Sequence, residues 1–353
     1  MDLKFKNKVI TGMLTVVPKN IVRFEDEMSN YNFPLEKSLK VKKVMGFDKK
    51  RIVEQGITAS DLSIHGLKYL IETQKLNKSE IDALIFVSQS SDYIMPPTSN
   101  IIQAGLDLND DVFCLDINQG CAGFLVGLFE SFSLLEQDSI NCVVLINADV
   151  LSPKVSKQDR NSNPIIGDAA AITIIKKGES DTIFGTLKMD GRGALALQIP
   201  AGGARMPIDE LTSMPKEDDY GNIRSLNHLV MKGDEVFNFV QTQVPPMIEH
   251  LLDISSTQIN DVDFFMFHQP NRFMLAKLAE KSGIDKSKMP ANIVEEFGNS
   301  SGATVPLNVC FNIGQKLVDS EYKICFAGFG VGLTWSSCIM NVGNLSFCEI
   351  QEY

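Results

Sequence analysis

The sequence predicts a layered α/β protein built from two similar halves. Short apolar runs rich in β-branched residues recur along its 353 residues, and helical stretches lie between them. Runs without polar alternation indicate strands covered on both faces, and their alternation with helices indicates an α/β architecture. Strands are predicted at residues 81–87, 112–117, 142–147, 170–175, 262–267 and 322–327.

Helices are predicted between these strands, for example at residues 60–73 and 271–282. Residues 122–135 are apolar nearly all round, which is typical of a helix enclosed by protein. The stretch 178–229 is less apolar, so we predict loops and a connector there.

Three similarities in the same order indicate a duplicated unit. Residues 81–89 resemble residues 262–269, and each segment is followed by a glycine-containing turn into a helix, at 119–123 and at 299–304. Another apolar strand follows each helix. We therefore divide the chain into residues 1–178 and residues 179–353, the second part comprising the connector and the second half.

Composition excludes several classes of protein. The net charge is -11, from 33 Lys and Arg against 44 Asp and Glu, which is the wrong sign for a nucleic-acid binder or for a protein held by anionic lipid. Seven cysteines without a Cys-x-x-Cys pair argue against a disulfide framework or a zinc site. Neither a signal peptide nor an apolar run approaching the roughly 18 residues of a membrane span is present. We expect a reduced, soluble, cytoplasmic protein.

Cys121 is the first candidate for chemistry. It follows a predicted strand, lies between Gly120 and Gly123, and opens the apolar helix. A helix N-terminus lowers the pKa of a thiol and favours the thiolate. The alternative is that Cys121 is a small core residue, as we predict for Cys114, Cys142, Cys310, Cys325 and Cys338.

Two further polar residues occupy positions where functional side chains are common. His268 ends an apolar strand, where ligands gather in α/β folds, although it could equally be a structural histidine. Asn299 lies in a glycine-bounded turn and could merely cap the next helix. His65, His228 and His250 lack such a setting and are predicted to be structural.

The segment 327–335 contains Gly-x-Gly-x-Gly after a strand. A dinucleotide site is a weak interpretation, because no helix opens there and the chain ends too soon for a βαβ unit. We instead predict a turn whose backbone N–H groups form an oxyanion hole.

Together these segments resemble the β-ketoacyl-[acyl carrier protein] synthase III family. The motifs are Asn-Gln-Gly-Cys-Ala-Gly-Phe at 118–124, Phe-His-Gln-Pro-Asn at 267–271, Gly-Asn-Ser-Ser at 298–301 and Phe-Gly-Val-Gly-Leu-Thr-Trp at 329–335. Their order and spacing match the family over essentially the whole chain.

The resemblance implies a thiolase-like fold, a five-layered α-β-α-β-α sandwich, usually in a homodimer. It implies a catalytic triad of Cys121, His268 and Asn299, with the backbone N–H groups of Cys121 and Val331 as the oxyanion hole. Cys121 would take an acyl group from a thioester, and decarboxylation of a malonyl thioester would give the carbanion that attacks it. His268 and Asn299 would both donate hydrogen bonds to the enolate oxygen. No metal or redox cofactor is expected.

The resemblance also assigns substrate contacts. Arg160 would meet the nucleotide end of coenzyme A, and Asn271 would lie along the pantetheine tunnel. Ile166 and Phe329 would line the acyl pocket, and Met95 would reach the acyl pocket of the partner subunit. For Met95, packing at the dimer interface is an equal alternative.

Other positions depart from the family pattern. The Trp and Arg that often clamp adenine are absent from residues 40–46, Asn238 replaces a docking Lys, and Phe273 stands where a basic residue is usual. These changes weaken the expectation of acetyl-CoA as primer and favour another thioester or a carrier-bound donor. A run of basic residues comprises Lys40, Lys42, Lys43, Lys49, Lys50 and Arg51. This run could be the surface that docks an acidic carrier protein, or it could simply be a solvated face.

Three rival functions remain. Some relatives transfer an acyl group to a hydroxyl or amine with the same Cys and His, but there the Asn position tends to be altered. A non-catalytic partner subunit typically loses the Cys. A dinucleotide-binding oxidoreductase has only the glycines near Gly330 in its favour.

Overall fold

The computed structural model describes residues 1–353 and contains two large sheets. The first sheet has the strand order β17-β2-β8-β7-β5-β6 and the second has the order β1-β9-β16-β15-β14. The first consists of β17 (Phe347–Glu352), β2 (Lys8–Val17), β8 (Ala169–Lys177), β7 (Cys142–Asp149), β5 (Ala83–Val87) and β6 (Phe113–Ile117). The second consists of β1 (Asp2–Phe5), β9 (Ile183–Met189), β16 (Thr334–Gly343), β15 (Glu321–Gly330) and β14 (Phe264–Phe267).

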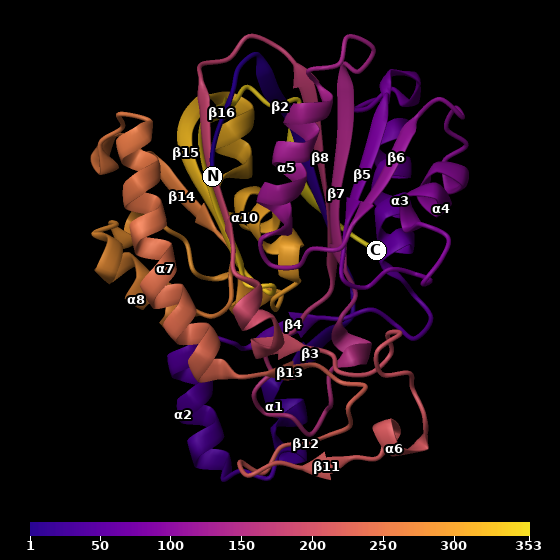
Figure 1. Cartoon of the computed structure of the whole chain (residues 1–353), viewed down its shortest axis with the longest axis vertical. Coiled ribbons are helices and arrows are strands. Elements are labelled where there is room, and N and C mark those ends of the chain that lie inside the picture. The colour runs from indigo at the N-terminus through magenta and orange to yellow at the C-terminus, as the bar shows by residue number, and fades with distance from the viewer.

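Helices cover both sheets and also lie between them, which gives five layers (Figure 1). The outer face of the first sheet packs against α3 (Ala59–Glu72) and α4 (Thr98–Gly105). The layer between the sheets contains α5 (Gly123–Leu134) and α10 (Thr304–Asp319). The outer face of the second sheet packs against α7 (Gly233–Ile254) and α8 (Arg272–Ser282). The predicted α-β-α-β-α sandwich is confirmed.

Burial explains why the apolar pattern predicted these elements well. Every residue of β5 and β7 is buried, because helices cover both faces of the central strands. The apolar helix predicted at 122–135 is α5, which is enclosed between the two sheets. The remaining predicted strands and helices are also present, with ends that shift by a few residues.

The predicted connector is partly wrong. Within residues 178–229, β9 is a full strand that pairs with β1 and β16 in the second sheet. Its sequence mixes polar and apolar residues because its last three residues are only partly buried or exposed.

The two terminal strands each pair in the sheet of the other half. The N-terminal strand β1 pairs in the second sheet, and the C-terminal strand β17 pairs with β2 in the first.

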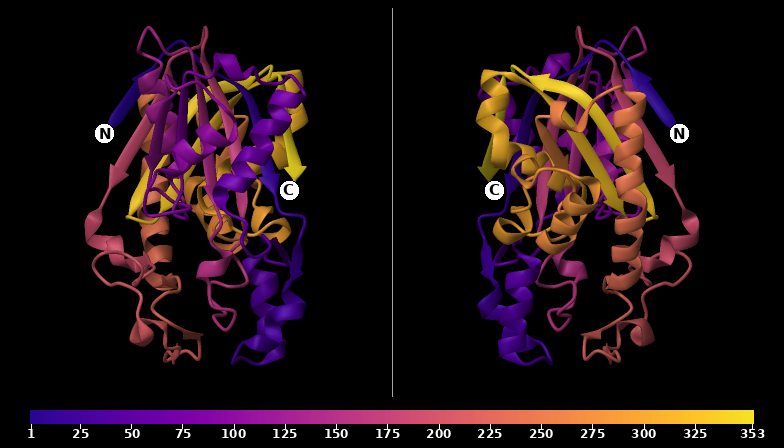
Figure 2. Two further views of the ribbon diagram at one scale, coloured as in Figure 1. Left: turned by 90° about the vertical axis from the view of Figure 1, so that its right-hand side faces the viewer. Right: turned by 90° about the vertical axis from the view of Figure 1, so that its left-hand side faces the viewer.

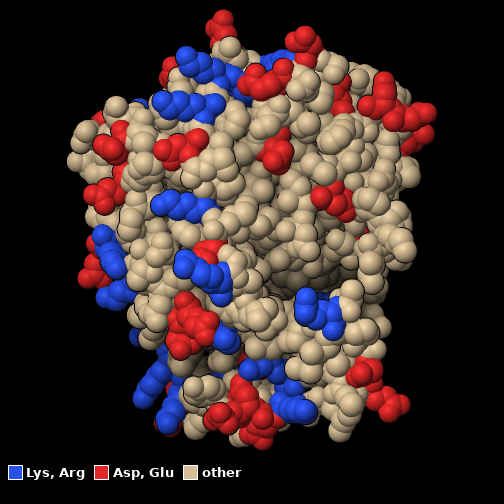
Figure 3. Space-filling model, in the orientation of Figure 1, with Lys and Arg blue, Asp and Glu red and all other residues tan.

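A smaller lobe extends below the sandwich, and Figures 1 and 2 show both chain termini on the sandwich instead. It comprises α1 (Phe24–Glu27), α2 (Leu35–Met45), β3 (Ile21–Arg23), β4 (Lys49–Arg51), β10 (Leu197–Gln198), α6 (Glu210–Ser213), β11 (Lys216–Glu217), β12 (Ile223–Arg224), β13 (Val230–Met231) and their loops. A further short helix, α9 (Ile293–Glu296), precedes α10. Figure 3 shows a hollow at the level where this lobe meets the sandwich, with basic side chains below it.

Candidate active site

Cys121 lies in a tight turn between β6 and α5. The Gly123 N–H donates to the Gly120 carbonyl over 2.6 Å, which closes the turn. A side chain at Gly120 would displace Gln89, because a Cβ there would lie 2.2 Å from Gln89 Oε1 and 3.2 Å from Ser301 Oγ. Cys121 itself is only 9% exposed. The turn thus presents the sulfur from a rigid, enclosed backbone.

The turn between β15 and β16 approaches the sulfur from the second half. A Cβ on Gly330 would lie 2.9 Å from Cys121 Sγ, so only glycine allows this approach. The backbone N–H groups of Val331 and of Cys121 itself lie against the sulfur. Two backbone N–H groups beside one sulfur are the kind of donor pair from which the predicted oxyanion hole would be built.

His268 follows β14 and is 2% exposed. Its N–H donates to the Ala327 carbonyl over 2.8 Å, and its Nδ1 lies 2.7 Å from Thr304 Oγ1. The ring packs edge-on against Phe329 with centroids 5.7 Å apart. Nε2 makes no hydrogen bond within the chain, and it is not among the fully buried atoms that lack a partner. Nε2 is therefore free for a substrate.

Asn299 is fixed by its own backbone and by the next turn. Its N–H donates to the Ile165 carbonyl over 2.6 Å, and Ile166 lies beside it in an isolated parallel bridge. The Ser301 N–H donates to Asn299 Oδ1 over 2.9 Å. The other end of the amide must therefore be Nδ2, which makes no hydrogen bond and is not sealed from solvent.

Ser301 connects the three predicted triad residues, although the sequence analysis did not single it out. It has a left-handed backbone with φ 56° and is 4% exposed. Its N–H binds Asn299, its carbonyl accepts from Thr304 over 2.8 Å, and its side chain lies against Cys121. The structure thus brings Cys121, His268 and Asn299 together around one strained residue.

The electrostatics of the site differ from the sequence-based expectation for Cys121. Burial raises the pKa of Cys121 to about 11, and the negative charge of Asp149 adds to the increase. The nearby N–H groups and the Ser301 hydroxyl only partly oppose it. For an enclosed thiol, the loss of solvation raises the pKa by more than the helix N-terminus lowers it.

His268 is neutral as well, because burial lowers its pKa to about 3. Resting Cys121 and His268 are therefore an uncharged thiol and an uncharged imidazole. If this sulfur is a nucleophile, it must lose its proton as it attacks, and a base must lie nearby.

Asp149 is a second residue that the sequence analysis missed. It ends β7, and it accepts hydrogen bonds from Gln89 N at 2.8 Å and from Ser88 Oγ at 3.2 Å. Burial raises its pKa to about 6 despite these bonds. An Asp at the end of a buried strand is the sequence signal that could have revealed it.

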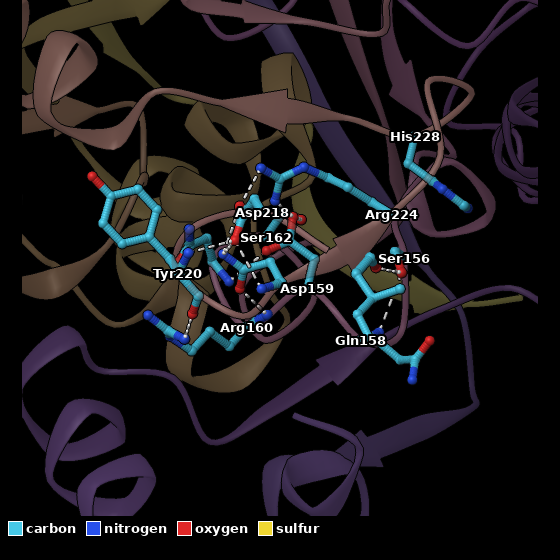
Figure 4. A network of polar contacts seen from close by, with 12 residues as sticks. Ser156, Gln158, Asp159, Arg160, Ser162, Asp218, Tyr220, Arg224 and His228 are labelled. Atoms are coloured by element: carbon cyan, nitrogen blue, oxygen red, sulfur yellow. Dashed lines mark hydrogen bonds and ion pairs between the residues drawn. The ribbon is translucent and has the colours of Figure 1, made fainter. Parts of the chain in front are cut away.

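Arg160 and Asn271, which the resemblance assigned to coenzyme A, both make contacts within the chain. Arg160 belongs to a network in the lower lobe: its guanidinium lies over the Phe33 ring at 4.4 Å and donates to the Tyr220 carbonyl (Figure 4). Asn271 caps α8, since its Oδ1 accepts from Met274 N over 2.8 Å. These contacts do not test the roles of Arg160 and Asn271 in binding coenzyme A, which stay predictions.

Met95 is exposed, and most cations of the basic run form ion pairs. Met95 is 82% exposed on the loop between β5 and α4. Most of the basic run is neutralised by carboxylates, in the ion pairs Lys42–Glu25, Lys42–Asp48, Lys49–Glu296, Lys50–Glu27 and Arg51–Glu352. Only Lys40 and Lys43, on exposed positions of α2, form no ion pair.

The remaining cysteines and histidines lie elsewhere. The cysteines predicted as core residues are buried except Cys114, which is only partly buried on the edge strand β6. His228 bonds Ser225, and His250 pairs with Asp2. No cluster of three or more His, Cys, Asp or Glu side chains could hold a metal ion. None of the helices combines the length and apolar character needed to cross a bilayer.

Comparison with known proteins gives a consistent result. Residues 115–193 match the family 3-Oxoacyl-[acyl-carrier-protein (ACP)] synthase III, and residues 252–342 match its C-terminal part. A 3-oxoacyl-(acyl-carrier protein) synthase from Burkholderia xenovorans LB400 has 32% sequence identity and a TM-score of 0.92, covering 100% of this chain and 99% of that one.

Two curated proteins named as synthases of this family are also similar to the chain. A Campylobacter jejuni protein, provisionally named a 3-oxoacyl-[acyl-carrier-protein] synthase 3, is 30% identical over 100% of this chain and 99% of its own. A β-ketoacyl-[acyl-carrier-protein] synthase III of Fusobacterium nucleatum is 29% identical over 94% of this chain and 97% of its own.

The fold and the cysteine-centred site define a condensing acyltransferase of the thiolase-like superfamily. More narrowly, the chain belongs to the 3-oxoacyl-[acyl-carrier-protein] synthase III family.

Proposed function

We propose that the protein loads an acyl group from a thioester onto Cys121 and condenses it with a malonyl thioester, with loss of CO₂. The observation that carries this proposal is that His268 Nε2 and Asn299 Nδ2 have no hydrogen-bond partner within the chain and remain available to a substrate. Asn299 Nδ2 can donate a hydrogen bond to the enolate oxygen, and such a donor accelerates decarboxylation because the charge on that oxygen develops only in the transition state.

The backbone groups of Cys121 and Val331 supply the second electrostatic element. During acyl loading, the thioester oxygen becomes an oxyanion next to these two N–H groups. Phe329 and Ile166 are both buried beside the triad, against His268 and Asn299 respectively, which supports their role in enclosing the acyl chain.

Intact-protein mass spectrometry tests the loading step. The protein is incubated with a panel of acyl-CoA and acyl-carrier-protein donors beside Cys121→Ala and Cys114→Ala. The expected result is a mass increase equal to the acyl group in the wild type and in Cys114→Ala, and none in Cys121→Ala. Release of CO₂ from malonyl carrier protein by the loaded enzyme then separates condensation from transfer to a hydroxyl or amine. An unmodified Cys121 with every donor would favour a non-catalytic subunit.

The donor is more consistent with a carrier-bound chain than with acetyl-CoA. Arg160 is held by Phe33 and Tyr220, and α2 carries no aromatic residue that could stack on adenine. Matched acyl-CoA and acyl-carrier-protein donors of one chain length decide this point. Equal or faster loading from CoA would reject the carrier-bound donor.

Docking of an acidic carrier protein would then use α2, because Lys40 and Lys43 of the basic run are exposed there and form no ion pair. Lys40→Glu/Lys43→Glu should raise KM for the carrier-bound donor and leave loading from CoA unchanged. Lys68→Glu, an exposed change on α3, is the matched control. An unchanged KM would place docking elsewhere.

We also propose a homodimer in which the loop carrying Met95 enters the partner. The exposure of Tyr93, Ile94 and Met95 supports this, because three adjacent large apolar side chains are rarely left in water. Sedimentation of the wild type and of Ile94→Lys tests it. A wild-type monomer would contradict the proposal.

A further inference from the structure

We infer that Thr304 is a positioning residue that holds the neutral His268 ring with its proton on Nδ1, so that Nε2 is a proton acceptor. Thr304 is the first residue of α10 and is fully buried. Its hydroxyl has three neighbours: His268 Nδ1 at 2.7 Å, the Ser301 carbonyl at 2.8 Å and the Gln269 N–H at 3.4 Å.

The assignment of the proton follows from counting donors and acceptors. A hydroxyl offers one hydrogen and two lone pairs. The Ser301 carbonyl can only accept, so it takes the single hydrogen, and the Gln269 N–H can only donate, so it occupies one lone pair. One lone pair remains for His268, whose Nδ1 must therefore donate. In a neutral imidazole, Nε2 then carries no proton.

The alternative proton position is unfavourable. If Thr304 donated to Nδ1, its oxygen and the Ser301 carbonyl oxygen would face each other at 2.8 Å without a hydrogen between them. The Ser301 carbonyl is held in place because its residue also bonds Asn299 through the N–H. Ser301 thus orients the Asn299 amide directly, and through Thr304 it sets which nitrogen of His268 carries the proton.

This assignment rests on the proposed function and gives His268 and Asn299 different roles in the reaction. In acyl loading, the Cys121 S–H bond breaks as Sγ bonds to the thioester carbonyl carbon, and the proton moves to Nε2. When the tetrahedral intermediate collapses, the C–S bond to the donor breaks and the same proton passes to the departing thiolate. The ring returns to its neutral Nδ1–H form, ready for the second step.

In the condensation step, an Nε2 without a proton cannot donate to the enolate oxygen. Asn299 Nδ2 is then the side-chain donor there, whereas the resemblance to the family implied that both residues donate. His268 acts as base and acid in the first step, and Asn299 acts as donor in the second.

Nitrogen NMR of protein labelled with [15N]histidine tests the proton position without any substrate. The chain has only four histidines, so the His268 signals are assigned by their loss in His268→Asn. The wild type should show Nδ1 protonated and Nε2 unprotonated. Thr304→Ser should keep this pattern, and Thr304→Val, which removes the hydroxyl but keeps the shape, should lose it. A wild-type proton on Nε2, or an unchanged pattern in Thr304→Val, would overturn the inference.

Loading kinetics supply the functional readout. Because base catalysis contributes roughly 10²–10⁴-fold, Thr304→Val should slow loading of Cys121 about 100-fold, and Thr304→Ser should restore it to within a few-fold. Slow loading in Thr304→Val with an unchanged proton pattern would make Thr304 merely structural. Failure of wild-type Cys121 to load would reject the proposed function alone, since the NMR result stands without it.

Discussion

The buried site around Cys121 and the network around Arg160 are held by different kinds of bonds. In the site, main-chain N–H groups bind the Asn299 amide and lie against the Cys121 sulfur, and one side-chain hydroxyl, that of Thr304, holds the His268 ring. In the lower lobe the contacts are mostly between side chains: Arg224 bonds Asp159 and Asp218 (Figure 4). The Arg160 guanidinium lies over the Phe33 ring. Main-chain bonds survive most substitutions of side chains. We therefore expect most substitutions to leave the contacts of Asn299 and Cys121 in place, whereas replacing Arg224 or Arg160 removes the contacts that hold the lower lobe.

The largest expected effect concerns Asn299. Asn299→Ala should reduce CO₂ release from malonyl carrier protein by about 10²–10³-fold, the usual cost of one lost donor to a developing oxyanion. Loading of Cys121 should change only a few-fold, because the hole made by Cys121 and Val331 remains. The two rates are measured separately, with Asn292→Ala as the control. Equal losses in both steps would mean that Asn299 only supports the fold.

The reactivity of Cys121 should follow its raised pKa. With a pKa of about 11, the thiolate fraction rises about tenfold for each pH unit between 7 and 9. The rate of Cys121 alkylation by iodoacetamide, read by mass spectrometry, should rise about 100-fold over that range. A plateau near pH 8 would show that the helix N-terminus outweighs burial after all.

Stability should depend strongly on the lower-lobe ion network. Arg224→Met leaves the buried Asp159 carboxylate without its cation and should lower the free energy of unfolding by about 3 kcal/mol. Arg192→Met is the control, because Arg192 pairs with Asp190 at the surface and should have no measurable effect. Urea unfolding compares them. A loss in Arg224→Met no greater than in Arg192→Met would contradict the structural role of the network.

Asp149 should destabilise the folded protein when it is ionised. Its pKa rises from 3.8 to about 6, so folding favours the protonated form, and the penalty is present above pH 6 and fades as pH falls towards 4. Asp149→Asn should therefore be more stable than the wild type by about 3 kcal/mol above pH 6. His268 has the opposite dependence but is common to both proteins, so their difference isolates Asp149. A difference that does not vary with pH would reject the assigned pKa.

The smallest expected effect is at Arg160. Arg160→Ala should lower the free energy of unfolding by about 1 kcal/mol, through the lost stacking on Phe33, and should change acyl-CoA loading only a few-fold. Chemical denaturation and loading kinetics measure the two effects. A loss of loading beyond 100-fold with unchanged stability would instead restore Arg160 as a coenzyme A contact.

Pattern and motif order predicted most of the layered fold. The central strands β5 and β7 carry uninterrupted apolar runs because both faces are covered, and such runs are visible without a structure. By contrast, β9 was predicted as connector because its exposed end carries polar residues. The exchange of β1 and β17 between the halves leaves no local signal, since it depends on pairing between distant segments.

In the sequence, residue type and position relative to strand ends and glycine turns made Cys121, His268 and Asn299 candidates, because these are local properties. The order of the motifs, which resembles that of the synthase III family, then predicted the three as a triad. Only the tertiary structure decided their protonation and the roles of Ser301, Thr304 and Asp149. Burial, which sets the pKa values of Cys121, His268 and Asp149, depends on how both halves enclose the site. The direction of each hydrogen bond likewise depends on neighbours that folding brings together from segments far apart in the chain.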